Sequence, residues 1–363
     1  MATEHPPRLR GLNLGGWLSQ IDAIQGKDPE KFPGIDKHIE TFITAADFAN
    51  VAQWGFDHVR VPIDSCLFFT DNEKPINSRL VNIDRAVALS KQHELKIILD
   101  LHECPGHDFA DAANAANSPV QRLFSGDDTC LKKTEKIWAC LAERYGSNEH
   151  ILFESLNEPV APTAAIWNTV KDRLCREIRR HAPKSTVITG PNMWNRPSAF
   201  GELTPFDDDN VVYSVHFYEP LLFTHQFAPW LNEPEMKVVR TYPSDYGPES
   251  ARKNGLALSK GIWDRGRLAE ELAPVDAFGK KYGVSIICDE FGVYAPVELG
   301  AQLRWYDDLL SVLMDMGIGF SYWNYKNLDF GIISAGERLH EALPQYDNAE
   351  RINHSVLDVL RKY

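Results

Sequence analysis

The sequence predicts an α/β fold that consists of one (β/α)8 barrel, a TIM barrel, and three observations support this expectation. Short, almost continuously apolar runs recur eight times along the chain, as expected for parallel strands that are buried on both faces. Amphipathic segments with a helical period follow most of these runs. The chain has 363 residues, a length that α/β barrels commonly use as one unit, so we expect a single domain over residues 1–363.

Each apolar run is expected to form one barrel strand. The first run contains the letters RGLNLGGWL. The fourth ends at Pro159, a residue that cannot donate to a strand ladder and therefore marks the exit of the strand. The expected strands are 9–18, 56–63, 96–103, 151–159, 186–194, 211–220, 284–292 and 317–325.

The segments between the strands are expected to be the outer helices. No clear helical pattern follows the fifth strand. Two connections are long, one after strand three at about 103–128 and one after strand six at about 221–264, and long loops at the carboxyl ends of barrel strands shape binding sites. The expected helices are 36–54, 81–94, 129–145, 163–181, 265–282, 299–316 and 349–362.

Composition excludes some classes of partner. The net charge is −13, so we expect neither a nucleic acid nor a membrane as a partner, and the chain has no run of about 18 apolar residues. The six cysteines are expected to be free thiols because they lack metal-type or disulfide-type spacing. The first residues lack the apolar stretch of a signal peptide. We therefore expect a cytoplasmic protein, although a secreted protein that had lost its signal would look the same.

Titratable and aromatic residues gather at the expected strand ends. In a barrel enzyme the catalytic groups lie at the carboxyl ends of the strands, so this concentration predicts an active site at one mouth of the barrel. The residues are Arg60, His102, Glu103, Asn157, Glu158, Asn192, Trp194, His216, Tyr218, Asp289, Glu290, Trp323 and Asn324.

The tetrapeptide Leu-Asn-Glu-Pro occurs twice, and its two copies have different contexts. The copy that contains Glu158 follows the apolar letters ILFES and ends a strand, whereas the copy that contains Glu233 lies in the long connection at 221–264. We therefore assign chemistry to Glu158 and a solvent-facing turn to Glu233. Asn157 and Glu158 are neighbours, so the strand must end or bulge for both side chains to face the mouth.

Glu158 and Glu290 end strands four and seven, which lie roughly opposite each other across a small barrel. Two carboxyl groups about 5–5.5 Å apart suit a retaining glycosidase, in which one group attacks the anomeric carbon and the other protonates the leaving oxygen. A nearby cation such as Arg60 favours the ionised form of a carboxyl group, and Tyr218 is expected to donate a hydrogen bond to the same group. Glu154, inside the fourth strand, is expected to be a buried partner of Arg60 or His102.

Taken together, these residues resemble glycoside hydrolase family 5, and the resemblance spans nearly the whole chain. It rests on Arg60, His102 in DLHE, Asn157-Glu158-Pro159, His216 and Tyr218 in HFY, Glu290 in DEFG and Trp323 in YWNY. The resemblance implies that Glu158 is the acid/base and Glu290 the nucleophile of a β-glycoside hydrolase that needs no cofactor and no metal. It also implies a cis bond between Trp323 and Asn324.

The resemblance implies supporting roles for the remaining residues. Asn157 would bind the sugar 2-hydroxyl, His216 would lie beside the acid/base, and His102 and Trp323 would line the site of the sugar whose bond is cleaved. The start RGLNLGGWL looks more like members that act on β-1,3-glucans or as exo-enzymes. Flat aromatic faces suit the C–H side of a pyranose, and the candidates for further sugar platforms are Trp194, Trp230 and Trp263.

The expected substrate is a β-linked glucan or glucoside, and three alternatives stay open. The first is a β-mannanase or β-mannosidase of the same family, since one hydroxyl orientation separates the two sugars. The second is a carbohydrate-binding barrel without activity. The third is a metal-dependent hydrolase on the same barrel, with ligands drawn from His102, Glu103, His107, His216 and Asp289.

Overall fold

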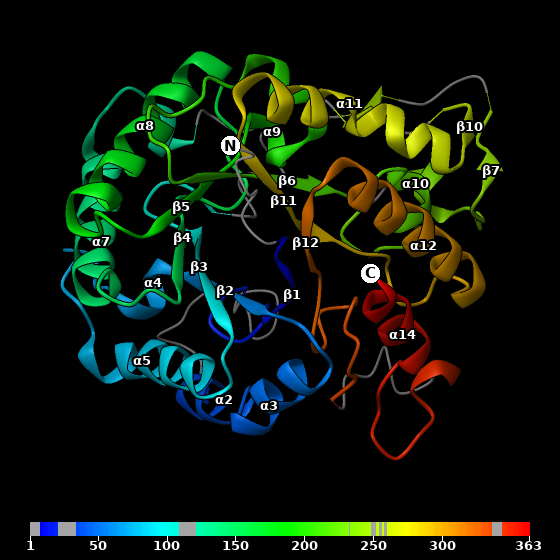
Figure 1. The fold of residues 1–363 in the computed structure, drawn as a ribbon, viewed down its shortest axis with the longest axis horizontal. Helices are drawn as coiled ribbons and strands as arrows, with labels where there is room; N and C mark the ends of the chain where they lie inside the picture. Colours follow the sequence, from blue (N-terminus) through cyan, green and yellow to red (C-terminus); the bar gives the residue numbers. More distant parts are fainter. Residues whose placement is uncertain are drawn as a thin grey trace, which may run out of the picture.

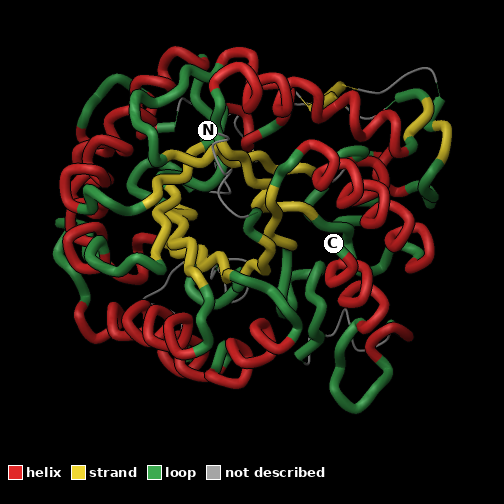
Figure 2. Tube along the Cα trace, in the orientation of Figure 1, coloured by secondary structure: helices red, strands yellow, loops and turns green. Residues whose placement is uncertain are grey.

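The computed structural model describes residues 8–20, 34–108, 121–231, 233–247, 252–253, 256–257, 260–335 and 343–363. Eight strands form a closed, parallel barrel in the order β1-β12-β11-β6-β5-β4-β3-β2. The helices surround this barrel as an outer layer (Figures 1 and 2). The expected (β/α)8 barrel is therefore confirmed.

All eight barrel strands begin within two residues of the expected positions, but all except β3 are shorter than expected. The strand β4 ends at Glu154 and so leaves Asn157 and Glu158 outside the ladder, which explains how both of these neighbours reach the mouth. The bounds are β1 (Arg10–Asn13), β2 (His58–Asp64), β3 (Lys96–Glu103), β4 (Ile151–Glu154), β5 (Thr186–Thr189), β6 (Val211–Phe217), β11 (Ser285–Phe291) and β12 (Gly319–Tyr322).

Three expected helices have the expected bounds, namely α7 (Thr129–Tyr145), α11 (Arg265–Tyr282) and α12 (Leu299–Met316). The expected helix 36–54 is wrong as one unit, because it forms α2 (Ile35–Thr41) and α3 (Ala45–Gln53). Thr44 and Asp47 form a capping box that starts α3. The remaining outer helices are α5 (Asn77–Gln92), α8 (Ala164–His181) and α14 (His354–Lys362).

The connections after β5 and β6 depart from the regular pattern. In place of a long helix, β5 is followed by α9 (Asn192–Asn195) and the 3-10 helix η3 (Pro197–Glu202). In the part of the connection after β6 that the structure describes lie α10 (Leu221–Thr224), η4 (Pro234–Lys237) and four two-residue strands. The strands are β7 (Ser244–Asp245), β8 (Arg252–Lys253), β9 (Leu256–Ala257) and β10 (Ile262–Trp263).

The connection after β3 is described on both sides of residues 109–120, and its second described part contains the 3-10 helix η2 (Arg122–Phe124). The short helix α4 (Ser65–Phe68) belongs to the preceding connection, after β2. The central residues of the long loop expected at 103–128, and parts of the loop expected at 221–264, lie outside the described residues.

The barrel interior changes from apolar to charged toward the mouth. Ile98 pairs in register with Leu152, and two residues further along Asp100 pairs with Glu154. Side chains two residues apart on a strand share a face, so both pairs face the same side of the sheet. Ile98 and Leu152 form a small apolar cluster with Ile188 and Ile287. This layer closes the barrel beneath the charged groups.

Among the helices of the described ranges, none is long and apolar enough to span a membrane.

Candidate active site

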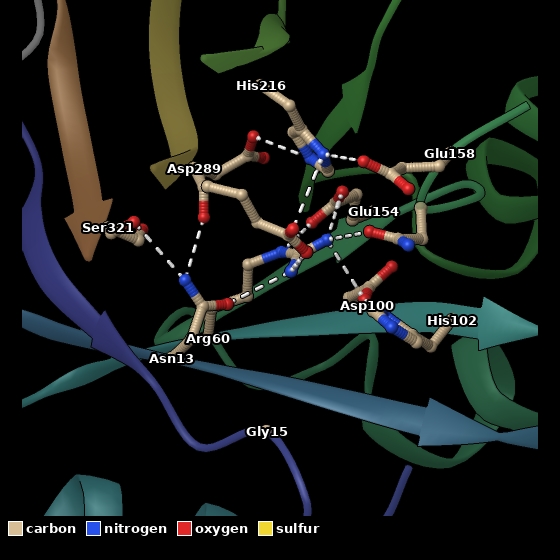
Figure 3. Close-up of polar contacts among 12 residues, drawn as sticks. Asn13, Gly15, Arg60, Asp100, His102, Glu154, Glu158, His216, Asp289 and Ser321 are labelled. Atoms are coloured by element: carbon tan, nitrogen blue, oxygen red, sulfur yellow. Dashed lines mark hydrogen bonds and ion pairs between the residues drawn. The ribbon is translucent and has the colours of Figure 1, made fainter. Parts of the chain in front are cut away.

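Arg60 on β2 occupies the centre of the barrel mouth with no exposed surface. Its Nε lies 2.7 Å from Oε2 of Glu154, its Nη1 lies 2.7 Å from Oε1 of Glu290, and its Nη2 lies 2.7 Å from Oδ1 of Asn157. A second bond, of 2.8 Å, joins Nη2 to Oε1 of Glu154, so this pair is bidentate. Figure 3 shows these contacts. The guanidinium therefore holds the two glutamates and Asn157 in fixed positions.

The charge of Arg60 is matched by a cluster of buried carboxyl groups. Burial opposes that charge, but Asp100 and Glu154 outweigh it and raise the pKa of Arg60. Asp100 lies 3.0 Å from Nη2 of Arg60. Burial raises the pKa of Glu154, even though Arg60 opposes this shift. Glu154 thus has the buried, structural role expected from the sequence.

Glu158 and Glu290 meet at the same histidine. Oε1 of Glu158 lies 2.7 Å from Nδ1 of His216, and Oε2 of Glu290 lies 3.5 Å from the same nitrogen. One oxygen of each carboxyl group lies within 4.8 Å of the other. Both glutamates are at most 8% exposed. The two carboxyl groups therefore face one another at a separation that fits one sugar carbon between them.

Local irregularities of β11 bring two neighbouring acids to the site. The register between β11 and β6 shifts between Cys288 and Glu290, which is the mark of a β-bulge. Oδ1 of Asp289 lies 3.3 Å from Nε2 of His216, while Glu290 reaches Arg60. In an undistorted strand these two side chains would lie on opposite faces.

His216 on β6 lies among three carboxyl groups. Burial disfavours its charged form, but the charge of Glu290 and the hydrogen bonds that His216 donates to Asp289 and Glu158 outweigh burial and raise the pKa of His216. Asp289 shows the reciprocal effect. Its burial is outweighed by the hydrogen bond to His216, which lowers the pKa of Asp289. Figure 3 shows His216 between Glu158 and Asp289.

Tyr218 completes the environment of Glu290. Its hydroxyl donates to Oε2 of Glu290 over 3.1 Å. Burial, reinforced by the negative charge of Glu290, raises the pKa of Tyr218. The phenol therefore stays protonated and serves as a donor. Glu290 thus receives hydrogen bonds on one oxygen from Arg60 and on the other from Tyr218.

The rings of His102, on β3, and Trp323, which follows β12, form a parallel pair at the barrel mouth. Their ring centres are 5.9 Å apart and the ring planes differ by 4°. Nδ1 of His102 lies 2.8 Å from Asp100. Gly15 makes room for the indole, because a Cβ at this position would lie 2.5 Å from the Trp323 ring. The Trp323–Asn324 peptide bond is cis, as expected from the resemblance.

The three candidate platform residues have different surroundings. Trp194 is partly exposed, and its backbone N–H donates to the carbonyl of Pro159 over 3.2 Å, so it lies beside the segment that carries Glu158. Trp230 is 44% exposed and keeps part of its ring open. Trp263 is only 3% exposed and the Arg267 guanidinium lies over its ring at 5.3 Å, so its expected role as a sugar platform is wrong. It packs as part of the core instead.

Two contributors to the site were missed by the sequence reasoning. Asn13 on β1 accepts a hydrogen bond of 2.9 Å from Arg60 and donates one of 2.8 Å to the carbonyl of Asp289. Asp100 bridges Arg60 and His102. The alternation of β3 was a usable indication for Asp100, because residues 100 and 102 share a face. Asn13 is the last residue of its strand and was hidden within the expected run 9–18.

Glu233, in the second Leu-Asn-Glu-Pro copy, does not end a barrel strand. Glu233 precedes the 3-10 helix η4 in the connection after β6 and is partly exposed. Asn232, its neighbour in the second Leu-Asn-Glu-Pro copy, lies outside the described residues.

The ligand set considered for a metal does not assemble as expected. In the described part of the chain, two groups place three possible ligand atoms within 4.8 Å, Glu154 with His216 and Asp289, and Glu158 with His216 and Glu290. Neither includes His102, whose Nδ1 is bonded to Asp100, or His107, whose Nδ1 is bonded to Gln121. Arg60 contributes a fixed positive charge within the same cluster, which disfavours a cation there.

Comparison with known proteins gives a consistent family assignment. The family model described as "Cellulase (glycosyl hydrolase family 5)" matches residues 23–329. Endoglucanase C of Acetivibrio thermocellus is 35% identical over 334 residues, which cover 89% of this chain and 92% of that protein. Cellodextrinase A of Ruminococcus flavefaciens is 30% identical over 313 residues, which cover 85% and 83%.

A solved structure supports the fold independently. Endoglucanase Cel5A from the hyperthermophilic Thermotoga maritima superimposes with a TM-score of 0.72 at 22% identity, over 97% of this chain and 96% of that one. At this identity the likeness establishes the barrel fold alone.

Proposed function

The chain belongs to glycosyl hydrolase family 5, and from this premise we propose that it cleaves β-linked glucans with Glu158 as acid/base and Glu290 as nucleophile. A glycoside hydrolase of this family acts with retention of the anomeric configuration. The names of the two curated relatives, an endoglucanase and a cellodextrinase, support β-1,4-linked gluco-oligosaccharides as substrates.

One observation carries the proposal. Oxygens of Glu158 and Glu290 approach within 4.8 Å, which agrees with the separation of about 5–5.5 Å in retaining glycosidases. An inverting enzyme needs roughly 6.5–9.5 Å, because a water molecule must fit between the second carboxylate and the sugar. The close pair therefore favours a covalent glycosyl-enzyme over direct attack by water.

In the first step, Glu290 attacks the anomeric carbon while the leaving oxygen takes a proton from Glu158. The hydrogen bonds from Arg60 and Tyr218 stabilise the ionised nucleophile. Nδ1 of His216 lies 2.7 Å from Glu158, so this pair supplies the proton at the leaving oxygen. The bond from the anomeric carbon to the leaving oxygen breaks as the bond to Glu290 forms.

In the second step, Glu158 accepts a proton from water, and the water oxygen attacks the anomeric carbon. The bond to Glu290 then breaks and the carboxylate returns to its contacts with Arg60 and Tyr218. Since each step inverts the anomeric centre, the product keeps the β configuration.

Three residues orient the sugar that becomes attached. Oδ1 of Asn157 accepts from Arg60, which leaves its amide protons to bind the 2-hydroxyl. Trp323 provides a flat floor, and Nε2 of His102 has no hydrogen-bond partner among the described residues. This nitrogen is therefore available to a sugar hydroxyl. Trp194, beside Pro159, extends the binding surface past Glu158.

A substrate screen tests the proposal. We expect hydrolysis of soluble β-1,4-glucan or cello-oligosaccharides, with the β anomer appearing first in a time-resolved NMR measurement. The panel includes aryl β-glucoside, aryl β-mannoside, and β-1,3- and mixed-linkage glucans. Initial release of the α anomer, or no hydrolysis of any β-glucan, would overturn the proposal. A mannoside preference would assign the enzyme to the alternative sugar.

Activity measured in the presence of a chelator distinguishes the proposed metal-free mechanism from the metal-dependent alternative. We expect the rate to be unchanged after treatment with EDTA, because the positive charge beside Glu290 comes from Arg60. Loss of activity that is restored by added metal would favour the metal-dependent mechanism.

A further inference from the structure

Asp289 is a buried carboxyl group that makes and breaks no bond in the two proposed steps. It has no exposed surface and immediately precedes Glu290 on β11. Its Oδ1 lies 3.3 Å from Nε2 of His216, and Figure 3 shows its carboxyl group turned toward that ring. Among the described residues, its Oδ2 makes no hydrogen bond. Asp289 therefore meets the catalytic groups through one oxygen and one histidine.

Ser214 holds the oxygen of Asp289 that faces His216. Ser214 and His216 are two residues apart on β6, so their side chains share a face. The Ser214 hydroxyl donates to Oδ1 of Asp289. Its oxygen accepts from Nδ2 of Asn195 over 3.1 Å, and the same nitrogen donates to the carbonyl of Asn157 over 2.6 Å. Because an amide nitrogen only donates, the single hydroxyl proton of Ser214 is committed to Asp289.

The contacts of His216 assign the protons of its ring. Burial raises the pKa of Asp289, but the hydrogen bond from His216 outweighs burial and lowers it. Asp289 is therefore ionised, its oxygens only accept, and Nε2 of His216 carries a proton. The other nitrogen, Nδ1, lies 2.7 Å from Oε1 of Glu158. Nδ1 and Glu158 share a second proton, which lies either on the ring or on the carboxyl group.

The charged and titratable groups around His216 come from four barrel strands and the segments that follow them. Oε2 of Glu290 lies 3.5 Å from Nδ1, and an oxygen of Glu154 lies within 4.8 Å of both His216 and Asp289. Within the described ranges, these groups are Arg60 on β2, Glu154 on β4, Glu158 after β4, Tyr218 after β6, and Asp289 and Glu290 on β11.

Asp289 differs from the other carboxyl groups around the ring in its charge during the reaction. Glu290 loses its charge when its bond to the sugar forms, and Glu158 gives up and regains a proton. Burial raises the pKa of Glu154, which favours its neutral form. Asp289 takes part in none of these changes, so its negative charge stays beside Nε2 through both steps. The proton on Nε2 is therefore held while the other proton moves.

We propose that Asp289 is a positioning residue for the acid/base: it holds one proton on Nε2 of His216, so that Nδ1 and Glu158 share the proton that the leaving oxygen receives. This inference rests on the proposed function, because it concerns the proton that Glu158 supplies. In the first step the shared proton goes to the leaving oxygen. In the second step the proton from water replaces it, and the proton on Nε2 stays in place throughout.

Two substrates that differ in their need for this proton test the role of Asp289. The sugar released from cellotetraose needs a proton, whereas the phenolate released from dinitrophenyl β-cellobioside needs none. Asp289→Asn removes the negative charge and keeps the size of the side chain. For cellotetraose, we expect the alkaline limb of the kcat/KM profile to move down by about one pH unit, because the imidazolium loses a neighbouring negative charge. For the dinitrophenyl substrate, we expect that limb to stay in place.

A second variant and a matched control accompany this measurement. Asp289→Ala removes the same charge without burying a new amide group, and we expect the same shift. Asp208→Asn removes an equal charge elsewhere. Asp208 accepts from Nε of Arg179 over 2.7 Å and precedes β6, so it lies at the end of the strand opposite the mouth. We expect both profiles of this control to match those of the wild type.

The ring protons of the wild-type enzyme give a measurement that needs no change to Asp289. In protein that contains isotope-labelled histidine, nitrogen NMR distinguishes protonated from unprotonated ring nitrogens. We expect Nε2 of His216 to be protonated on both sides of the alkaline limb, while Nδ1 loses its proton across that limb. His216→Gln identifies the signals by their absence. An unprotonated Nε2 above the limb would overturn the inference.

The outcomes separate this inference from the proposed function. If the wild type hydrolyses neither substrate, the proposed function itself fails. If the wild type is active and the alkaline limb for cellotetraose stays in place in the Asp289 variants, the inference is overturned. A rate that falls equally at every pH would give Asp289 only a structural role and would also overturn it. Equal shifts for the two substrates would do the same, because the dinitrophenyl group needs no proton.

Discussion

The two sides of the barrel mouth differ in the burial of their side chains and in the kind of contacts that these side chains make. On the side of β2, β3 and β12, Arg60, His102 and Trp323 are at most 5% exposed and lie in a dense network of ion pairs and stacked rings. On the side of β5 and β6, Trp194 and Trp230 retain open surface. The Arg196 guanidinium lies over the Trp194 ring, and Trp230 packs against Tyr294. The first arrangement holds buried charges around Arg60, whereas the second leaves aromatic surface open.

Removing Glu290, the proposed nucleophile, is the strongest test of the charged side of the mouth. In Glu290→Ala we expect the rate on every substrate to fall by more than about 10³-fold, because no other described carboxyl group is placed to form the glycosyl-enzyme. Steady-state kinetics with aryl and oligosaccharide substrates measure the effect, and added azide should restore part of the rate on an activated aryl glycoside.

The second Leu-Asn-Glu-Pro copy provides the control for this experiment. Glu233→Ala should retain wild-type kinetics, since Glu233 only precedes the short helix η4. A Glu290→Ala enzyme that kept more than about a hundredth of the wild-type rate would contradict the assignment.

These assignments show which parts of the structure can be predicted from sequence. The helices α7, α11 and α12 were predicted because each has a sustained amphipathic pattern with clear ends. The strand β4 was predicted too long, because Leu156 is fully buried by packing after the ladder has ended. The capping box at Thr44 was present in the sequence and overlooked.

The same distinction holds for the site. Glu158 and Glu290 were proposed from their places at strand ends, since barrel topology brings such residues together. His225 and Phe330, whose rings lie near Tyr218, are in irregular connections, where no periodicity fixes the direction of a side chain. Their proximity to Tyr218 depends on backbone bonds such as that from Tyr294 to Thr224, which a sequence pattern does not specify.

Glu158 stands at the border between the two sides, so its replacement should depend on the leaving group. In Glu158→Gln we expect a loss of about 10²–10⁴-fold for cello-oligosaccharides, whose leaving oxygen needs a proton. The loss in the first step should be far smaller for a dinitrophenyl glycoside, whose leaving group needs none. Pre-steady-state release of dinitrophenol measures that step directly. Equal losses for both leaving groups would contradict the role of Glu158 as the acid.

Arg60 tests how much the charged side contributes to folding. Arg60→Met removes the cation shared by Asp100, Glu154 and Glu290 and leaves these buried carboxyl groups without a neutralising guanidinium. We expect the free energy of unfolding to fall by about 3–5 kcal/mol, measured by chemical denaturation. Arg144→Met is the surface control. It removes a partly exposed pair with Asp84, which is worth at most about 1 kcal/mol. Similar losses in the two variants would contradict the comparison.

Two histidines that follow each other closely in the chain give the smallest but most direct test of the contrast. His216 has a raised pKa because the carboxyl groups of Glu290, Asp289 and Glu158 outweigh burial. His225, which lies among the rings of Tyr218, Trp230 and Phe330, has a pKa lowered to about 4 by desolvation. The unfolded value for both is about 6.5, so their contributions to stability should change with pH in opposite directions.

The sign follows from which state holds the proton. Folded His216 keeps its proton above pH 6.5, so its contribution is fully present below about 6.5 and is lost as the pH rises through its raised folded pKa. Folded His225 resists protonation, so the unfolded state binds more protons between about pH 6.5 and 4, and stability is lost as the pH falls through this range.

We therefore expect the stability difference between wild type and His216→Gln to shrink above about pH 6.5. The difference between wild type and His225→Phe should change mainly between about pH 6.5 and 4, in the direction that makes the variant relatively more stable in acid. Unfolding curves at a series of pH values measure both differences. Parallel changes for the two variants would mean that the charged and aromatic sides of the mouth do not impose the opposite environments that their contacts indicate.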